Sequence, residues 1–538
     1  MSALENIFRY HQSSKHGYNS FAPGPGYLDW YSQPDPFRRY EGAEVIPLKK
    51  ISPTKKPLFS EALQPSTIAV SPLTFESISQ LFFDSLAISA WKSFQGSKWA
   101  LRVNPSSGNL HPTEGYLISG PLKGLSQTPS ISHYSPLLHG LEIRATFPIE
   151  IWTKMLDGLP RDTIFIGLSS IYWREAWKYG LRAFRYCHHD LGHALAAINI
   201  ACAGLGWRAV LMDQLSCKDL EIILGLKTKN DDEVEVPDCL VAISPKEISS
   251  NWNFEKQQSL DSFSNLNWCG TPNILSKTHV AWPGINEVSQ NTRKPFTTSY
   301  PNFNFRAGSL SKLLADNLFP LREAIHQRRS AVAMDGRTTI KRETFYQFLI
   351  KTIPEACPIP FQTLPWEPNV HLGLFVHRVD DLPRGLYFLL RNRSHLQDLR
   401  EKFNHDFLWE KPEGCPTELD LFLLDQGNFM RTAASVSCGQ DIAGNGCFSL
   451  GMISAFEGPL KKYSSWFYPR LYWECGAIGQ VLYLQAEVSG IRSTGIGCFF
   501  DDPVHQIFGI QDMSYQSLYH FAVGGPVEDT RLTTLPPY

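Results

Sequence analysis

Two long segments of the chain combine apolar and small side chains with the spacing of a helix. One covers residues 190–201 and the other residues 474–485. Each begins at an acidic residue, and each reaches a glycine sixteen positions later, at Gly206 and Gly490. Apolar residues that recur with helical periodicity over such a length predict an amphipathic or buried helix. We therefore predict two similar central helices, one in each half of the chain.

The two segments keep a constant offset of 284 positions, since 474 − 190 = 284. The register holds without a gap backward to Lys178-Tyr179 against Lys462-Tyr463, and forward to Gly225 against Gly509. Identity is low, but an ungapped register over this span is hard to obtain by chance. An internal repeat of this kind indicates that one ancestral domain has been duplicated.

Each half then follows the same order of elements: a helix pair, an extended strand, the long helix, a short strand, another helix and a last strand. In the second half we expect helices at 321–329 and 341–351, and strands at 371–375 and 519–523. Mixed helices and strands of this kind predict an α+β fold. A length of 538 residues also favours more than one domain. The expected organisation is an N-terminal extension (1–45), a first domain (46–248), a linker (249–315) and a second domain (316–538).

The two connecting segments have distinctive compositions. The 249–315 linker is rich in Asn, Ser, Thr and Pro, and a connector of this length is either a surface linker or a strap that covers a functional surface. The first 45 residues are dense in Tyr, Pro, Gly and Arg. This composition predicts an irregular extension rather than a run of helix or strand.

Composition and charge narrow the class of protein. The chain has 50 Lys and Arg against 52 Asp and Glu, for a formal net charge of −2, which argues against a nucleic-acid partner. No apolar run approaches the roughly 18 residues that span a membrane, and the N-terminus lacks the features of a secretory signal. Eleven cysteines without a C-x-x-C pattern argue against a disulfide framework. We expect a soluble, cytoplasmic protein without a membrane partner.

A motif in the first half resembles a known family. Residues 102–112 are Arg-Val-Asn-Pro-Ser-Ser-Gly-Asn-Leu-His-Pro, which is similar to the Pro-Ser-(Ser/Ala)-Gly signature of nitroreductase-like flavoproteins. Within that family the motif resembles the azoline-oxidising dehydrogenases of peptide natural-product pathways (the SagB/ThcOx type). That branch carries an Arg shortly before the motif and a His-Pro or Tyr-Pro shortly after it. Residues 10–16 and 28–40 resemble the N-terminal extension of the same branch.

The second half continues the resemblance in chain order. Arg328-Arg329-Ser330 matches the Arg-Arg-Ser at the end of the first family helix, and residues 494–502 and 523–531 resemble the C-terminal segments that contact the flavin. Family members are homodimers with two flavins at the interface. The resemblance implies that each flavin takes the Arg-Arg-Ser, the glycine segment and the C-terminal Arg from one subunit, and the Pro-Ser-Ser from the other.

The chemistry of FMN is consistent with these residue types. A phosphate dianion favours Arg, hydroxyl and backbone N–H groups, and glycine lets the backbone approach closely. Hydroxyl and amide groups can hydrogen bond to the edge of the flavin ring, where donors tune its electronics. The resemblance thus implies these FMN-binding residues: Pro105, Ser106, Ser107 and Asn109 from the first half, and Arg328, Arg329, Ser330, Thr494, Gly495, Ile496, Gly497 and Arg531 from the second.

Each half lacks the part of this set that the other half keeps. In the first half, residues 63–67 stand where Arg-Arg-Ser would be and contain no arginine, and residues 210–213 replace both glycines of 494–497. In the second half, residues 365–369 stand where Pro-Ser-Ser-Gly would be. We therefore predict one composite FMN site per chain, one empty degenerate site, and a monomer that acts as an intramolecular pseudo-dimer. The alternative is that both sites bind flavin, but one would then lack its cationic phosphate ligands.

Lys178 and Tyr179 are the candidate catalytic residues, because the azoline-oxidising branch has a Lys-Tyr pair beside the flavin. A base must take a proton while flavin N5 accepts hydride, and a partly buried Lys or a Tyr could serve. The alternative is an ordinary pair on a helix surface. His111 directly follows the motif and is a candidate for contact with substrate or flavin. His189 and His193 have a spacing that metal ligands use, but without a third ligand we expect no metal site.

These features favour an FMN-dependent dehydrogenase that acts on a small-molecule or peptide-derived heterocyclic substrate. An NAD(P)H-dependent nitroreductase-type reductase is an alternative. No G-x-G-x-x-G follows a strand, but family members bind NAD(P)H loosely over the flavin without a motif. A further alternative is a catalytically silent partner of a modification complex, which the presence of one complete site disfavours.

Overall fold

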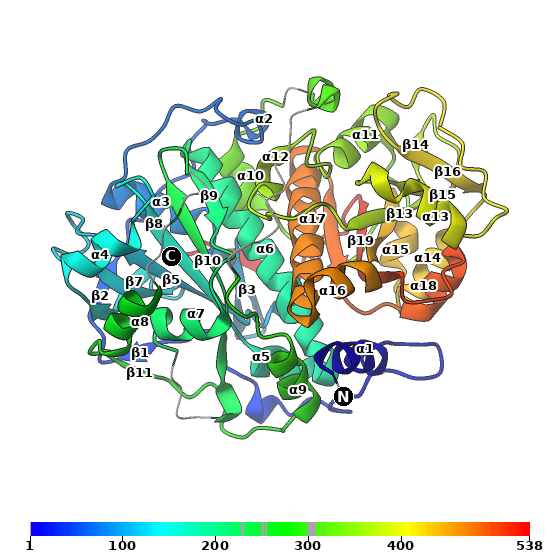
Figure 1. Ribbon diagram of the computed structural model, residues 1–538. Coiled ribbons are helices and arrows are strands. Elements are labelled where there is room, and N and C mark those ends of the chain that lie inside the picture. Colours follow the sequence, from blue (N-terminus) through cyan, green and yellow to red (C-terminus); the bar gives the residue numbers. More distant parts are fainter. Residues whose placement is uncertain (1, 227–230, 249–251, 253–255, 298–307, 316) are drawn as a thin grey trace.

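The computed structural model describes the chain except for residues 1, 227–230, 249–251, 253–255, 298–307 and 316. Two antiparallel sheets form the centres of two halves that lie side by side (Figure 1). The first sheet has the order β2-β7-β6-β5-β8-β10-β9. Its strands are β2 (Val45–Pro47), β5 (Thr113–Ser119), β6 (Ser130–Ser135), β7 (Gly140–Thr146), β8 (Ile164–Ile171), β9 (Arg208–Leu211) and β10 (Glu235–Ser244).

The second sheet repeats this topology strand for strand, without a counterpart of β2. Its order is β16-β15-β13-β17-β19-β18, and every pairing in both sheets is antiparallel. Its strands are β13 (Val370–Val376), β15 (Gly385–Leu389), β16 (Leu421–Gln426), β17 (Phe448–Ala455), β18 (Arg492–Ile496) and β19 (Tyr515–Gly524). The equivalent order confirms the expected α+β fold and supports the duplication inferred from the sequence register.

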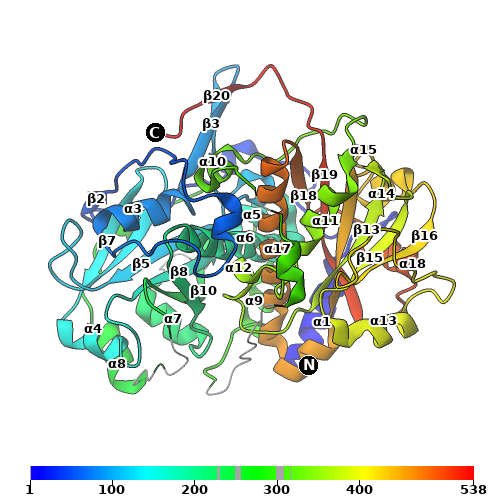
Figure 2. The same ribbon diagram turned by 90° about the horizontal axis from the view of Figure 1, so that it is seen from above.

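Helices connect and cover the strands of each half (Figures 1 and 2). Those of the first half are α2 (Phe59–Ala62), α3 (Phe75–Phe83), α4 (Ile149–Met155), α5 (Tyr172–Tyr179), α6 (Ala183–Gly204) and α7 (Cys217–Leu224). Those of the second are α10 (Leu321–Gln327), α11 (Arg342–Ile350), α12 (Pro358–Phe361), α13 (Leu396–Lys402), α14 (Met430–Val436), α15 (Ile442–Asn445), α16 (Glu457–Tyr463), α17 (Tyr468–Val488) and α18 (Asp501–Phe508). Helices α10 and α11 and strands β13 and β19 match the expected elements within a few residues at each end.

The two long helices pack against each other between the two sheets (Figure 1). They are in backbone contact at Gly192 of α6 and Gly476 of α17, which are equivalent positions because 192 + 284 = 476. A Cβ atom at Gly192 would overlap the carbonyl oxygen of Trp473, and one at Gly476 would overlap that of His189. Small residues at both positions therefore allow the backbones to meet. Because equivalent positions of the two halves meet in this contact, the two halves lie against each other as the two subunits of a symmetric dimer do.

The N-terminal extension contains a regular helix, so the expectation of an irregular segment was wrong there. Helix α1 (Ala3–Ser13) begins with a capping box, in which Ser2 and Glu5 exchange side-chain and backbone hydrogen bonds. Ile7 and Tyr10 are buried, and Phe8 packs against Phe456 of the second half. The helical period of these apolar residues was hidden among the polar and aromatic residues of the extension.

The linker and the C-terminal tail both form strand pairs with distant parts of the chain. The described part of the linker contains α8 (Lys256–Ser264), β11 (Thr271–Pro272) and α9 (Pro283–Asn291), and β11 pairs with β1 (Tyr40–Glu41) of the extension. At the other end, β20 (Thr533–Leu535) crosses to the first half and joins β3 (Ile88–Phe94) and β4 (Ser97–Arg102) (Figure 2). A two-stranded β12 (Ile340–Lys341) and β14 (Val379–Asp380) pairing completes the strands.

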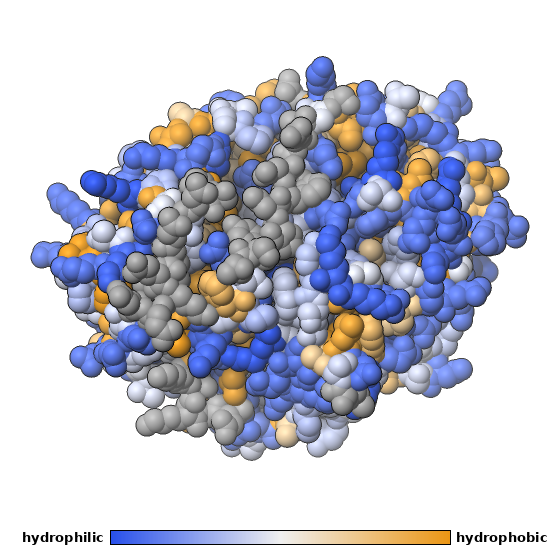
Figure 3. Space-filling model, in the orientation of Figure 1, coloured by the Kyte–Doolittle hydropathy of each residue, from blue (hydrophilic) through white to orange (hydrophobic). Residues whose placement is uncertain are grey.

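The face seen in Figure 3 is mainly hydrophilic, with apolar side chains in scattered patches. Over the described part of the chain, no helix has both the length and the apolar character needed to cross a bilayer.

Candidate functional site

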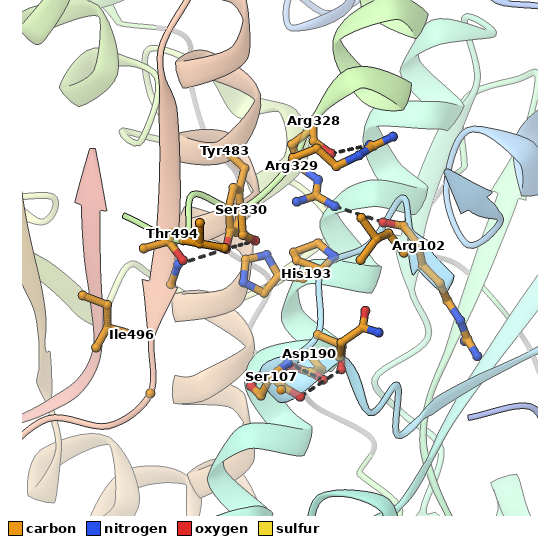
Figure 4. Close-up of a pocket in the computed structure, with 18 of the residues that line it drawn as sticks. Arg102, Ser107, Asp190, His193, Arg328, Arg329, Ser330, Tyr483, Thr494 and Ile496 are labelled. Atoms are coloured by element: carbon orange, nitrogen blue, oxygen red, sulfur yellow. Dashed lines mark hydrogen bonds between the residues drawn. The ribbon is translucent and has the colours of Figure 1, made fainter. Parts of the chain in front are cut away.

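A cavity of about 470 Å³ lies between the two halves and is lined by both of them. In Figure 4, Arg102, Ser107, Asp190 and His193 of the first half face Arg328, Ser330, Tyr483 and Thr494 of the second. The lining includes most of the site residues predicted from the sequence. These are Pro105, Ser106, Ser107, Asn109, His111 and Tyr179 from the first half, and Arg328, Arg329, Ser330, Thr494, Gly495, Ile496 and Gly497 from the second.

The motif 102–112 forms a tight loop after β4. The backbone N–H and the hydroxyl of Ser107 both donate to Asp190 of α6, each at 3.0 Å. The hydroxyl of Ser106 accepts from the backbone N–H of His111 at 2.8 Å. Gly108, Asn109 and His111 all have a positive φ, which an ordinary residue adopts only when its surroundings hold it there. The loop is thus held in one conformation, with its serines along the cavity wall.

Asn109 and His111 hold each other in place within this loop. The Asn109 amide nitrogen donates to the carbonyl of Ala100 at 2.9 Å, and its amide oxygen lies 2.9 Å from Nε2 of His111. Burial lowers the pKa of His111 well below its usual range, so the ring is neutral and Nε2 is the protonated nitrogen. Its other nitrogen, Nδ1, has no hydrogen-bond partner among the described residues and is left as an acceptor.

Two guanidinium groups lie together on the second half's side of the cavity. Arg328 follows directly after α10, and its side chain is buried over the ring of Tyr483, 5.0 Å from the ring centroid. It donates to the carbonyl of Arg102 at 3.0 Å, and Arg329 donates to the hydroxyl of Ser89 at 3.3 Å. Burial lowers the pKa of both guanidinium groups, that of Arg329 to about 10. Among the described residues neither forms an ion pair within 4.0 Å, and the carboxylate of Glu487 acts on both from further away. Two guanidinium groups with one distant carboxylate leave net positive charge at the cavity.

Gly495 and Gly497, at the end of β18, can pack against neighbouring aromatic residues because glycine has no side chain. A Cβ atom at Gly495 would overlap the hydroxyl of Tyr519, and one at Gly497 would lie 2.5 Å from the ring of Tyr186. The backbone N–H of Gly495 donates to the hydroxyl of Tyr483 at 2.9 Å, and the same hydroxyl lies 2.9 Å from that of Ser330. The backbone of this segment therefore forms part of the cavity wall directly.

The Lys178-Tyr179 pair lies at the end of α5, behind the serine loop. A Cβ atom at Gly108 would lie 2.5 Å from the Tyr179 hydroxyl and 3.2 Å from the Lys178 ammonium nitrogen. Tyr179 lines the cavity, whereas Lys178 does not belong to the lining. Burial raises the pKa of Tyr179 well above its usual range. Its side chain is therefore a phenol that can donate a hydrogen bond.

A buried acid lies beneath the same loop. Burial raises the pKa of Asp190 to about 7, although its bonds to Ser106 and Ser107 act in the opposite direction. The equivalent acid of the second half, Glu474, forms an ion pair with Arg391 instead. No lysine or arginine lies within 4.0 Å of Asp190 in the described part of the chain, which leaves this carboxyl close to the point of titration at neutral pH.

Arg531 is the one predicted FMN ligand that does not line the cavity, although Asp529 and Leu532 beside it do. Its side chain is 73% exposed and pairs with Asp529 of the C-terminal tail at 2.8 Å. The guanidinium also lies over the ring of Phe94 in β3, 5.7 Å from the ring centroid. A role for Arg531 in holding a phosphate gains no support from this position.

Several lining residues were not predicted from the sequence. Arg102 is part of the quoted motif but was not counted as a site residue, and Arg492 begins β18 and pairs with Glu528 of the tail at 2.6 Å. Among the others, five come from the central helices and the last strand: Asp190, His193, Tyr186, Tyr483 and Tyr519. Their only sequence signal is their position on one face of α6 or α17, because polar residues in a long apolar helix need a partner or a cavity.

The space that corresponds to this cavity on the opposite side of the central helices is closed. Asp213 and Arg470, which correspond to Gly497 and Tyr186 at the offset of 284, form a buried ion pair at 2.6 Å. Lys294 of the linker lies in the same place. The remaining cavity is about 10 Å³, about the space of one water molecule. Because no ring system fits in this space, the geometry of the described residues agrees with the expected degenerate site at this position.

The fold and the composite cavity define a nitroreductase-like α+β protein in which two domains of one chain take the places of two subunits. The solved structure of a protein from Anabaena variabilis matches over 97% of this chain and 99% of its own, with a TM-score of 0.69 and 22% identity. A protein of Methanocaldococcus jannaschii is 23% identical over 163 residues, which cover 29% of this chain and 77% of that protein. Both carry the name "putative nitroreductase".

Other comparisons add little to this assignment of the fold. A chain from the McbBCD microcin synthetase complex of E. coli matches 46% of this chain with a TM-score of 0.28, which is too low to decide between branches of the family. No model of a known protein family matches the sequence. The likeness at these identities establishes the fold, and the activity has to be argued from the site.

Proposed function

We propose that this chain is an FMN-dependent oxidoreductase with one FMN in the cavity between its halves. The observation that carries the proposal is the pair of guanidinium groups of buried Arg328 and half-buried Arg329, neither of which forms an ion pair within 4.0 Å among the described residues, although the carboxylate of Glu487 acts on both from further away. Burying unpaired charge is costly, and a phosphate dianion would offset this cost through charge-assisted hydrogen bonds.

Three further features of the cavity fit FMN. Its volume of about 470 Å³ lies within the roughly 300–1,000 Å³ that is usual for cofactor sites. The backbone of Gly495–Gly497 offers an edge where side chains would intrude, and the hydroxyls of Ser106 and Ser107 offer hydrogen-bonding groups from the opposite half. In addition, Nε of Arg328 is a buried donor without a partner in the described part of the chain, and Arg328 belongs to the cavity lining.

Within this family resemblance we propose a dehydrogenase of the azoline-oxidising type, acting on a small-molecule or peptide-derived heterocyclic substrate. Bound FMN supplies a hydride acceptor at its N5 position. Tyr179, kept as a phenol by burial, donates a hydrogen bond to the substrate. Lys178, beside it behind Gly108, takes the substrate proton through the Tyr179 hydroxyl. The tight backbone at Gly108 keeps the Lys178 and Tyr179 side chains together.

The flavin content of the purified protein tests the cofactor and the single-site proposal together. We expect a yellow protein with one FMN per chain, measured by flavin absorbance after release against protein concentration. A colourless protein that does not take up added FMN would refute the proposed function. Two FMN per chain would leave the cofactor standing but contradict the single composite site.

Rapid mixing of the FMN-loaded protein with azoline substrates or NAD(P)H tests the proposed chemistry, with flavin bleaching as the signal. We expect Lys178→Met to slow bleaching by azolines at least about 100-fold, the size usual for loss of a general base, with FMN binding unchanged. Lys462→Met is the matched control, because Lys462 has the same register in the second half but is exposed and pairs with Glu367. Equal rates for both variants would exclude Lys178 from the chemistry, and bleaching by NAD(P)H alone would favour the reductase alternative.

A further inference from the structure

Two cysteines lie together at one end of the cavity. Cys498 directly follows the glycine segment and is part of the cavity lining. Cys438 follows α14 and has a positive φ of 55°. Both thiols are partly exposed, and neither is in a disulfide. They are 60 residues apart in the sequence, because 498 − 438 = 60, and no cysteine motif connects them.

The two segments that carry these cysteines are tied together by hydrogen bonds. The side-chain amide of Gln440 donates to the carbonyl of Ser437 at 2.8 Å and to that of Cys498 at 3.1 Å. The backbone N–H of Phe500 donates to the carbonyl of Val436 at 2.8 Å. Residues 436–440 and 498–500 are therefore held side by side, which places the two cysteines on neighbouring segments. Cysteines on neighbouring segments can form a disulfide where their Cα atoms come within about 7 Å of each other.

The surroundings of Cys498 favour its thiolate. The neighbouring Cys438 thiol lowers the pKa of Cys498 below its usual range, and His16 and the positive charge of Arg182 act in the same direction, against the effect of burial. His16 accepts a hydrogen bond from the backbone of Ala22 on Nδ1 at 2.9 Å, so its Nε2 carries the proton that can be donated to sulfur. A cysteine held as thiolate beside a second thiol is the arrangement that thiol–disulfide exchange requires.

We propose that Cys438 and Cys498 form a redox-active dithiol–disulfide pair that exchanges two electrons with the flavin of the same cavity. The inference rests on the proposed function, because it needs the flavin as its redox partner. In the reducing direction, the flavin hydroquinone anion loses two electrons and one proton. The S–S bond takes up both electrons and breaks, Cys438 takes up the proton as a thiol, and Cys498 leaves as a thiolate. In the oxidising direction the same atoms and electrons move in reverse.

This pair gives the chain a second two-electron centre beside the first. Cys498 belongs to the cavity lining, whereas Cys438 does not and is also partly exposed. Electrons from the flavin could therefore leave through a thiol that an external disulfide reaches without entering the flavin cavity. The chemical class of such an acceptor is a small or protein disulfide.

An anaerobic reductive titration of the FMN-loaded protein tests the proposal after mild oxidation with a disulfide such as oxidised glutathione. We expect full reduction of the wild type to take two more electrons per chain than flavin alone requires. The Cys438→Ser variant should still bind FMN but take only the electrons of the flavin. Cys269→Ser, which removes an exposed thiol elsewhere, should behave as the wild type. Peptide mass mapping without reduction should find a Cys438–Cys498 cross-link.

The possible failures can be told apart. If both thiols are alkylated as readily after oxidation as before, the pair does not form a disulfide and the proposal is wrong, whatever the protein's colour. If the cross-link forms but the titration takes no additional electrons, the pair does not exchange electrons with the flavin, and the proposal is again overturned. A protein that binds no flavin refutes the proposed function first, and the redox exchange with it, while the mapping still reports on the thiols.

Discussion

Substitution of Arg328 by methionine should affect FMN binding and protein stability in different ways. Methionine fills a similar volume but removes a guanidinium that is buried over Tyr483 and has no carboxylate partner among the described residues. A charge-assisted hydrogen bond contributes about 1.5–3 kcal/mol, and each 1.4 kcal/mol is a factor of about ten in affinity. We therefore expect Arg328→Met to raise the Kd for FMN roughly 10- to 150-fold.

The stability of the apoprotein should change much less. The substitution removes one hydrogen bond to the carbonyl of Arg102, at a cost of about 1 kcal/mol, but it also removes the desolvation cost of an unpaired buried charge. These effects oppose each other, so the free energy of unfolding of the apoprotein should stay within about 1 kcal/mol of the wild type or rise. Functional residues often carry such a conflict between activity and stability.

Fluorescence titration with FMN and thermal unfolding of the apoprotein and the FMN-loaded protein measure the two effects separately. Arg208→Met is the control, because Arg208 belongs to the first half and pairs with Glu247 on the surface. An Arg328→Met protein with unchanged FMN affinity and a strongly destabilised apo form would show that Arg328 has a structural role, and the reasoning from unpaired charge would be wrong.

Three other substitutions test the remaining features. Gly497→Asp copies the degenerate position Asp213 and should abolish FMN uptake by equilibrium dialysis, because a side chain there meets the ring of Tyr186; retained binding would contradict the assigned cavity wall. Asp213→Ala leaves Arg470 buried without its partner, so unfolding in denaturant should show a loss of about 3–5 kcal/mol, while FMN stays at one per chain; a second bound FMN would refute the closed site. For Asp190, whose pKa is raised to about 7, the native state binds the extra proton. Its stabilising contribution is therefore complete below about pH 4 and is lost as the pH rises towards 7. Asp190→Asn should remove this dependence, on the order of 4 kcal/mol, and parallel pH profiles of Tm for the two proteins would contradict it.

Much of the fold could be predicted because the two halves preserve one pattern. The register between 190–201 and 474–485 placed the two central helices, and the strands at 371–375 and 519–523 were predicted from apolar runs. The helix of the N-terminal extension was missed, because its apolar positions are few and it is stabilised by contacts such as Phe8 with Phe456. The local sequence does not indicate a contact with a residue almost 450 positions away.

The site was predictable where it depends on motifs, and less so where it depends on packing. The serines of the motif and the Arg-Arg-Ser segment meet in one cavity, as the complementary losses in the two halves suggested. Arg531 was chosen from its place in a motif, but it pairs with Asp529 in the exposed tail. Asp190 and His193 were seen in the sequence as part of a helix, and only the loop that closes over them makes them part of a site.

The sequence by itself determined the duplication, the α+β class, and the division of one phosphate-binding set and one serine loop between two halves. These are properties of residue type and spacing, which need no knowledge of distant contacts. The tertiary structure decided which of the two equivalent spaces is open. In one, Gly497 faces Tyr186 without a side chain between them; in the other, Asp213 and Arg470 fill the space with an ion pair. That difference depends on pairs of residues from opposite halves, which meet only when α6 and α17 pack at their glycines.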